Sequence, residues 1–422
     1  MPSRHRPVET PPAREAGETK VNKGFWQAGH RPTLLAAFLY FDLSFMVWVM
    51  LGPLAPYVAA ELGLNAAEKG LMVAVPTLAG AVLRLVNGVL VDRIGPKRTG
   101  AIGQVIVIAG LLTAWALGVH SFAGTIALGV ILGFAGASFA VALPLASRWY
   151  PAEHQGTALG IAGMGNSGTV FAALFAPGIA KLTGWTTVLG LAAIPLAIVF
   201  VVYLALAKDA PHPPAPKPIT AYLEPLRKAD AWWFMLFYGV SFGGFVGLSS
   251  SLSIHFTDQY GLSPVVAGYC TAACVFSGSL IRPFGGALAD RIGGIRTLTL
   301  VYALAAMTLA VISTGPSTVP LALGLFMVAM MALGAGNGAV FQLVPQRFRE
   351  EMGVMTGLVG FSGGVGGFYL ASSLGLAKQL TGSPQLGFLI FAGLALVALG
   401  CLTFVKSKWR ATWGAALEGV RI

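Results

Sequence analysis

The chain has 422 residues, of which 56% are hydrophobic and only 10% are charged. Soluble domains carry about 25% charged residues, so this composition excludes an ordinary water-soluble globule and indicates that lipid surrounds most of the protein. The net charge of +11 does not indicate nucleic-acid binding. The basic residues lie in short loops between long apolar runs, which is the positive-inside pattern of membrane proteins.

Twelve apolar segments are long enough to cross a ~30 Å hydrocarbon core as helices. The expected fold class is therefore an all-α polytopic membrane protein with twelve transmembrane helices. We expect the spans near residues 34–56, 70–91, 99–118, 122–146, 155–180, 186–207, 231–255, 264–289, 297–314, 318–342, 353–377 and 386–406.

The distribution of lysine and arginine predicts the orientation. With both termini in the cytoplasm, Lys69, Lys181 and Lys378 are the basic residues left outside, and the reverse orientation would invert this bias. A proline-rich linker divides the chain into two halves of six spans each. The expected organisation is a cytoplasmic tail without a cleaved signal peptide (1–31), a first half (32–207), a cytoplasmic linker (208–230), a second half (231–408) and a second cytoplasmic tail (409–422).

The two halves repeat each other in sequence. LRLVNGVLVDRIGPKR in the first half aligns with IRPFGGALADRIGGIR in the second, which matches Arg84 to Arg282 and Asp92 to Asp290. GTALGIAGMGNSG in span five aligns with GVMTGLVGFSGGV in span eleven. Two parallel repeats of six spans predict an alternating-access transporter whose site lies between the halves near the midplane.

The motif GxLxDRxGxxR follows span two and recurs after span eight. It resembles the major facilitator superfamily, and the resemblance covers nearly the whole chain. It implies that Asp92, Arg93, Asp290 and Arg291 are gating residues on the cytoplasmic side, in ion pairs that break as the halves rock. A basic loop that only sets topology is the alternative, but aspartate contributes little to topology and is present in both copies.

Arg84 and Arg282 are predicted to lie near the membrane centre. Each precedes its aspartate by eight residues, or ~12 Å of helix, and half of the hydrocarbon core is ~15 Å thick. A charge there is unfavourable, and arginine does not escape by deprotonating. Asp42 is the one acidic residue that lies deep within a predicted span, so both arginines cannot be neutralised by a buried acid. We therefore expect the arginines to form a binding site for an anion.

Other side chains are expected at the same depth. Asn166, Asn337 and Tyr238 offer hydrogen-bond donors to an anion, and Phe139 and Phe242 would shape the pocket and exclude water. For each phenylalanine taken singly, ordinary helix packing is the stronger interpretation.

Three motifs resemble the nitrate/nitrite porter family: GMGNSGTVFAALFAP in span five, GAGNGAVFQLVPQRF in span ten and GLVGFSGGVGGF in span eleven. The resemblance implies that the two arginines clamp a planar anion. It also implies that Asn166 and Tyr238 complete the pocket, with Phe139 and Phe242 above and below the anion. The repeat partner of Asn166 is Gly363, so span eleven lacks the asparagine that some forms of this motif carry. A symmetric role for a second asparagine in span eleven is therefore not expected. The glycines that carry the signatures are Gly163, Gly165, Gly168, Gly360, Gly363 and Gly364.

The predicted function is secondary transport of nitrate, nitrite or both by alternating access, in a multi-pass protein of a bacterial inner membrane. Anion uptake works against ~2.3 kcal/mol per 100 mV, so it needs coupling. Asp42, ~12 Å deep in span one, is the candidate for coupling to protons, and a structural ion pair or polar contact is the alternative. Nitrate/nitrite exchange, and transport of another small oxyanion or a carboxylate, are further alternatives.

An enzyme is not expected. The three cysteines lie in apolar segments, and His120 and His255 lie near the outer membrane edge without partners at ligand spacing. We therefore expect no cofactor and no metal. The expected partners are nitrate or nitrite, protons and the lipid bilayer, with no nucleic acid, and the fold favours a monomer.

Overall fold

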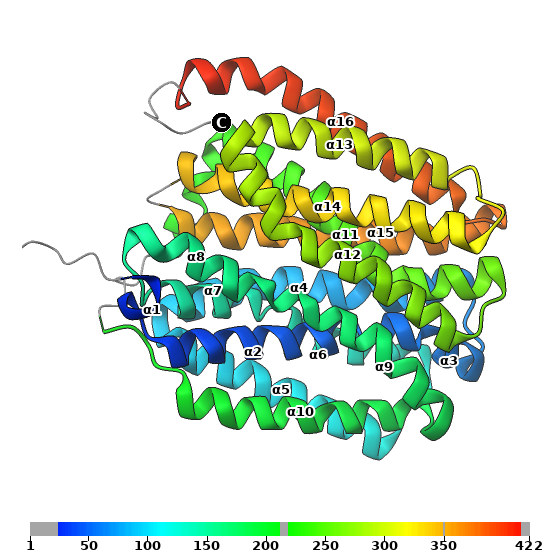
Figure 1. The fold of residues 1–422 in the computed structure, drawn as a ribbon. Helices are drawn as coiled ribbons and strands as arrows, with labels where there is room; N and C mark the ends of the chain where they lie inside the picture. Colours follow the sequence, from blue (N-terminus) through cyan, green and yellow to red (C-terminus); the bar gives the residue numbers. More distant parts are fainter. Residues whose placement is uncertain (1–23, 212–217, 349–350, 415–422) are drawn as a thin grey trace, which may run out of the picture.

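The computed structural model describes residues 24–211, 218–348 and 351–414. Within these residues, twelve helical segments are long and apolar enough to cross a membrane, which confirms the predicted all-α fold with twelve spans. The start of α2 (Arg31–Trp48) and the end of α16 (Gln385–Ala411) lie at the same end of the bundle (Figure 1). We call this the terminal end, and the other the opposite end.

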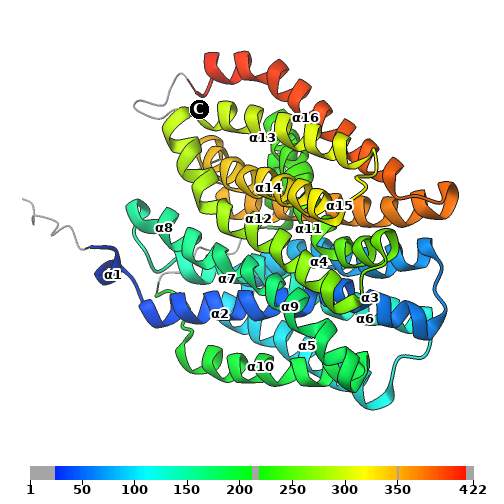
Figure 2. The ribbon, with the colours of Figure 1, turned by 45° about the vertical axis from the view of Figure 1, so that its right-hand side comes forward.

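The first half forms the lower bundle in Figures 1 and 2. Three of its six spans are interrupted: the first is α2 with α3, the fourth is α6 with α7, and the fifth is α8, η1 and α9. The remaining bounds are α3 (Leu51–Leu62), α4 (Ala66–Ile94), α5 (Pro96–Leu117), α6 (Phe122–Gly136), α7 (Phe139–Ser147), α8 (Ala152–Gly163), η1 (Met164–Ser167), α9 (Gly168–Thr183) and α10 (Trp185–Leu206).

The second half forms the upper bundle, and each of its six spans is one continuous helix. Two short 3₁₀ turns, η2 (Ile219–Tyr222) and η3 (Glu224–Arg227), precede it. The bounds of the other helices are α11 (Ala229–Tyr260), α12 (Pro264–Ile292), α13 (Gly294–Ile312), α14 (Val319–Arg347) and α15 (Met352–Thr381).

The interruptions follow from local sequence. Pro53, at the third position of α3, has no N–H to bond the carbonyl of Val49, so the first span bends between α2 and α3. In span five, Gly163 and Gly168 flank the 3₁₀ turn η1 and Gly165 lies within it, and their low helix propensity lets the helix tighten there. Mid-membrane 3₁₀ turns often mark functional positions.

The helices extend beyond the predicted spans. The first covers Arg31–Leu62 rather than 34–56, because a helix continues past the hydrocarbon core to side chains that reach the interface. The last residues of the predicted tail at 1–31 form a short helix that packs against the bundle. Although residues 1–23 lie outside the described part, α1 (Phe25–Ala28) follows them, and the ring of Phe25 stacks on Tyr150 at 4.8 Å.

Candidate functional site

Arg84 lies on α4 with only 1% of its surface exposed. Its Nε donates to the carbonyl oxygen of Gly136 at 3.1 Å, and its Nη1 donates to that of Gly360 at 2.6 Å. Gly136 belongs to the first half, whereas Gly360 lies on α15 of the second. The guanidinium therefore joins the two halves, and both bonds are charge-assisted.

The break between α6 and α7 makes one of these carbonyls available. In a continuous helix, the N–H of Ala140 would bond the oxygen of Gly136, but here it bonds Ala137 at 3.1 Å. The freed oxygen of Gly136 accepts from Arg84. Asn87, nearly one turn along α4, donates to Ala137 at 3.3 Å. The interruption of span four thus supplies the acceptors that fix Arg84.

Aromatic rings surround the Arg84 guanidinium. Its central carbon lies between 5.1 and 6.0 Å from four ring centroids, within the range of cation–π attraction. The rings stabilise a charge that arginine cannot lose. They belong to Phe45, Trp48, Phe139 and Phe242.

Arg282, the repeat partner on α12, has a looser setting. Its side chain is partly exposed, and its Nη2 lies 3.5 Å from the hydroxyl oxygen of Tyr238 on α11. Arg84 and Arg282 lie close enough to interact electrostatically with each other and with this hydroxyl. The predicted arginines and tyrosine therefore meet at the boundary between the halves.

Phe45, Trp48 and Phe341 were not predicted as site residues. Phe341 on α14 lies between the rings of Phe139 and Tyr238, at 6.0 and 5.0 Å. The motif GAGNGAVFQ already contains Phe341. A third repeat would have indicated Phe45, because FDLSF in span one aligns with YGVSF in span seven and matches Phe45 to Phe242.

Several buried polar atoms at this level have no hydrogen-bond partner among the described residues. Two are guanidinium nitrogens, and two are amide oxygens, which exchange identity with nitrogen when the amide is flipped. Buried polar groups are almost always bonded in folded proteins, so these atoms are available to bond water or a ligand. They are Arg84 Nη2, Arg282 Nη1, Asn166 Oδ1 and Asn337 Oδ1.

Asn166 lies on η1, which packs against α2 and against α12, the helix of Arg282. Its neighbour Ser167 donates a hydrogen bond to Asp42 Oδ1 at 2.7 Å. Asp42 is buried and forms no ion pair within the part of the chain that the structure describes. The candidate coupling acid is therefore linked to the span-five signature and not to an arginine.

The signature glycines of span five mark close packing against span one. A Cβ on Gly165 would lie 2.5 Å from the ring of Phe41, and one on Gly168 would lie 1.7 Å from the backbone oxygen of Asp42. A Cβ on Gly163 would meet nothing within 4 Å. Two of the three therefore allow α2 to approach the helix backbone.

On α15 the signature glycines face the site and the first half. A Cβ on Gly363 would lie 2.8 Å from Phe242 and 3.0 Å from Tyr238, and one on Gly360 would lie 3.4 Å from Arg84. The absence of side chains at these two positions leaves space for Phe242, Tyr238 and Arg84.

α4 and α15 run antiparallel and pack against each other across the boundary between the halves. Towards the opposite end they are tight: a Cβ on Gly70 would lie 2.8 Å from the Cα of Gly375, and one on Gly364 would lie 2.6 Å from the Cβ of Ala81. A side chain at Gly70, Gly364 or Gly375 would clash with the facing helix, so α4 and α15 are in close contact at this end.

Beyond Arg84 the same two helices separate. Continuing the register by one turn would bring Gly88 opposite Gly357, but a Cβ on either would meet nothing within 4 Å. The α4–α15 contact is therefore tight towards the opposite end and loosens from the arginine level towards the terminal end.

The predicted gating residues lie at the terminal end. Asp92 pairs with Arg148 at 2.5 Å and accepts a hydrogen bond from Tyr222 of the linker. Burial and Asp92 raise the pKa of Tyr222, so its hydroxyl stays a donor at physiological pH. Arg93, and in the second half Asp290 and Arg291, are exposed.

At the terminal end of the second half, Arg347 pairs with Asp230 and Lys228 pairs with Glu351, whereas Asp290 forms no ion pair with a described residue. Arg347 Nε lies 2.5 Å from Asp230 Oδ2, whose other oxygen accepts from the indole N–H of Trp409. The first half therefore uses the aspartate of the repeated motif, Asp92, in its ion pair, whereas the second half uses acids outside that motif.

Within the described residues, no group of three or more histidine, cysteine, aspartate or glutamate side chains could hold a metal ion.

Comparison with known proteins gives relatives in sequence and fold. The family model described as Major Facilitator Superfamily matches residues 36–371. The chain is 33% identical to the probable nitrate/nitrite transporter NarK2 of Mycobacterium tuberculosis, covering 88% of this chain and 95% of that protein. It is 32% identical to the nitrite extrusion protein of Bacillus subtilis, covering 84% and 89%. It is 30% identical to the probable nitrate transporter NarT of Staphylococcus carnosus, covering 87% and 94%.

Solved structures share the fold at low sequence identity. A bacterial homologue of the human lysosomal transporter Spinster, in an inward-facing and occupied conformation, superposes with a TM-score of 0.68 at 17% identity, covering 89% of this chain and 96% of that one. The nucleoside transporter NupG superposes with a TM-score of 0.66 at 16% identity, covering 88% and 99%.

Proposed function

We propose that this chain, which belongs to the Major Facilitator Superfamily and within it to the nitrate/nitrite porter family, carries nitrate or nitrite across the membrane by alternating access. It is a multi-pass inner-membrane protein. One observation carries the proposal: two repeat-related arginines meet at the boundary between the halves, and each has a buried N–H group without a partner among the described residues.

The chemistry of the pocket fits a small planar oxyanion. Guanidinium groups bind such anions through paired N–H donors. Arg84 is held by backbone carbonyls, which are uncharged, and Asp42 bonds Ser167, so neither arginine has a carboxylate partner among the described side chains. The surplus positive charge attracts an anion and repels cations. The rings of Phe139, Phe242 and Phe341 limit the space around it.

The distribution of basic residues supports placing the terminal end in the cytoplasm. In this orientation the tight crossings of α4 and α15 face the outside and the looser part of this helix pair faces the cytoplasm, so we expect the anion site to open first towards the cytoplasm. In the alternate state, α4 and α15 part at Gly70 and Gly375 and approach at Gly88 and Gly357. Both helices carry glycine at these crossings, which lets backbones slide past each other.

Proton-coupled uptake is the mechanism we favour, with Asp42 as the coupling acid. The chain Asp42–Ser167–Asn166 connects a carboxylate to a candidate substrate ligand through adjacent residues of η1. Intramembrane acids commonly serve as proton relays. A change in protonation at Asp42 would alter its hydrogen bond to Ser167 and so displace η1.

Counterflow in proteoliposomes tests the substrate. Vesicles loaded with nitrate should take up labelled nitrate, nitrite should compete with it, and formate, chloride and sulfate should not. Arg84→Lys and Arg282→Lys should both reduce counterflow, because an ammonium group cannot form a bidentate clamp. Normal transport by both lysine variants would contradict the site, and preferential competition by sulfate or formate would reassign the substrate.

The coupling proposal needs a separate assay. Asp42→Asn should abolish nitrate accumulation driven by an imposed pH gradient and leave counterflow intact, whereas Asp42→Glu should retain part of the accumulation. Full proton-driven accumulation by Asp42→Asn would exclude Asp42 from coupling. Acceleration of nitrate influx by internal nitrite, without any response to the pH gradient, would favour nitrate/nitrite exchange.

A further inference from the structure

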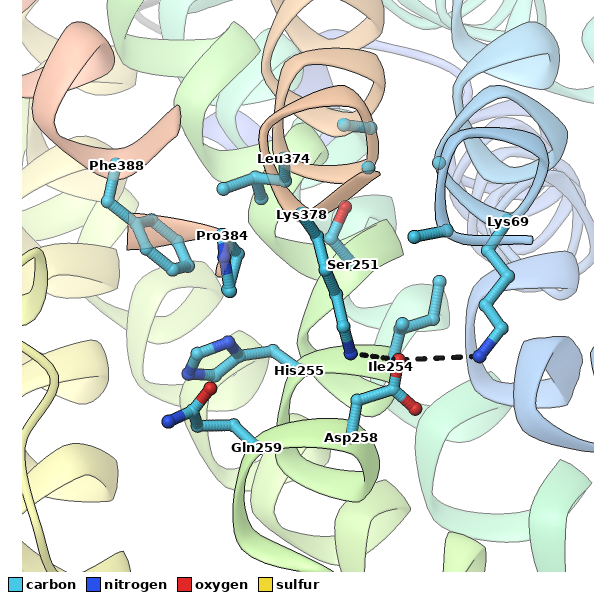
Figure 3. Close-up of a pocket in the computed structure, with 14 residues that line it drawn as sticks. Lys69, Ser251, Ile254, His255, Asp258, Gln259, Leu374, Lys378, Pro384 and Phe388 are labelled. Carbon is cyan, nitrogen blue, oxygen red and sulfur yellow. Dashed lines mark hydrogen bonds and ion pairs between the residues drawn. The ribbon is translucent and has the colours of Figure 1, made fainter. Parts of the chain in front are cut away.

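Three charged side chains from both halves meet at the opposite end. Lys69 Nζ on α4 lies 3.3 Å from Asp258 Oδ2 on α11, and Lys378 Nζ on α15 lies 2.6 Å from the same oxygen. Figure 3 shows both lysines pointing at this carboxylate, one from each side. One anionic oxygen is thus held between two ammonium groups, each a donor with three N–H bonds.

The cluster has more positive charge than its carboxylate neutralises. Two other acids near this end have donors elsewhere: Glu61 accepts from the indole N–H of Trp185, and Glu68 caps α4 through Asn65. Asp258 is therefore the carboxylate that both lysines share. An anion that approached them would meet a net positive site.

A small cavity of about 40 Å³ adjoins this cluster, and Lys69, Lys378 and Asp258 line it. A water molecule needs roughly 10–15 Å³ by this measure, so the cavity suits a few atoms and not a large solute. His255 also lines it and has a buried Nδ1 without a partner among the described residues. Its ring lies against Phe388 at 5.2 Å, which fixes it on one wall.

The position of the cavity matters for transport. Lys69 precedes Arg84 on α4 by fifteen residues, or ~22 Å of helix. Gly70 and Gly375, where α4 and α15 cross tightly, also line the cavity. The two lysines therefore lie on the boundary between the halves, on the side from which an anion would enter at this end.

We propose that Lys69 and Lys378 form a second, outer binding site for a small monovalent oxyanion, in which the anion replaces the carboxylate of Asp258 between the two ammonium groups. The inference rests on the proposed function. Asp258 acts as an internal competitor: while it occupies the position it holds the two halves together, and the arriving anion releases it. Binding at the outer site and opening of that end are then one event.

The proposal predicts that removing a lysine and removing the aspartate of this cluster shift KM in opposite directions. Initial rates of nitrate influx from the opposite side, in oriented proteoliposomes of the full chain, give KM and kcat. Lys69→Gln and Lys378→Gln should each raise KM about threefold to fivefold, since each removes a partly exposed charge contact. Asp258→Asn should lower KM by about threefold, because it removes the competitor. Both shifts should shrink at high salt, which screens such charges.

A latch without an anion site gives a different pattern. All three substitutions would then break the same contact, change kcat together and move KM in one direction, and this result would overturn the proposal. Lys181→Gln is the matched control, because Lys181 is an exposed lysine near the same end but outside the cluster. A KM shift in that control as large as in Lys69→Gln would also overturn it. Failure of the proposed function is distinguishable, because wild-type protein would then show no nitrate influx.

Discussion

Arg84 and Arg282 occupy equivalent places in two repeated halves, yet their surroundings differ. Arg84 is buried, bonds two backbone carbonyls and is enclosed by four rings. Arg282 is partly exposed and has one long contact, with Tyr238. We propose a division of labour in which Arg84 is a fixed anchor and Arg282 is the arm that closes on the anion.

The cause lies in the helices around each arginine. In the first half, spans one, four and five are interrupted near the midplane, and the break after Gly136 frees a carbonyl for Arg84. The corresponding spans of the second half are continuous helices of 32, 29 and 30 residues. A continuous helix uses its own carbonyls, so α14 leaves Arg282 without such an anchor. Repetition in sequence therefore does not impose symmetry on the site.

The largest expected effect concerns the packing of the first half. Gly168→Ala places a methyl group 1.7 Å from the backbone oxygen of Asp42, and backbone cannot move aside. We expect a loss of more than about 3 kcal/mol of stability and little folded protein in size-exclusion chromatography. Gly178→Ala, on the same helix with open space at its Cβ, should leave the protein intact. Equal behaviour of the two variants would contradict the tight contact of spans one and five.

The hydrogen bonds that anchor Arg84 should contribute to the free energy of unfolding. Arg84→Lys keeps at most one of the two bonds to Gly136 and Gly360, and a hydrogen bond to a charged group contributes about 1.5–3 kcal/mol. We expect the free energy of unfolding to fall by about 2 kcal/mol. Arg282→Lys should change it by less than about 0.5 kcal/mol. Thermal or denaturant unfolding in detergent measures both, and similar losses would remove the distinction between anchor and arm.

Gly363 and Gly360 on α15 of the second half differ in how closely they approach the aromatic rings near Arg84. Gly363→Ala would press a methyl group against Phe242 and Tyr238, whose atoms lie 2.8 and 3.0 Å from the new Cβ. The rings must shift, so we expect the KM for nitrate to rise about tenfold in a folded protein. Gly360→Ala meets its neighbours at ordinary contact distance, and KM should stay within about twofold. A normal KM in Gly363→Ala would dissociate these rings from substrate binding.

The smallest effect is expected at the terminal end. Asp92→Asn removes a partly exposed ion pair with Arg148, worth about 0.2–1 kcal/mol, and should change the transport rate by about twofold to fivefold. Asp290 is exposed and forms no ion pair with a described residue, so Asp290→Asn should have no measurable effect. If the two variants reduced transport equally, the repeat motif would act symmetrically despite the different contacts.

Composition and depth were sufficient to predict much of the molecule. The twelve spans followed from apolar length, because a helix in lipid must satisfy its own backbone. Arg84, Arg282 and Tyr238 are predicted from the sequence because a charged or polar side chain at mid-membrane is unfavourable and is usually functional. The structure brings these three side chains together.

The remaining features depend on contacts that no single segment specifies. The anchor at Arg84 needs a break in span four and a carbonyl from span eleven, which are distant in sequence. The cluster of Lys69, Asp258 and Lys378 joins three helices, so the positive-inside count placed the lysines outside without indicating that they share an acid. Phe45 could have been found from the repeat of FDLSF and YGVSF.

We propose that a small oxyanion binds between the anchored Arg84 and the more mobile side chain of Arg282. Isothermal titration of purified full-length protein with nitrate, for wild type and Arg282→Lys, tests it most directly. We predict saturable binding by the wild type and affinity at least about tenfold weaker in Arg282→Lys, with an unchanged melting temperature. Wild-type affinity for nitrate in Arg282→Lys would contradict the account.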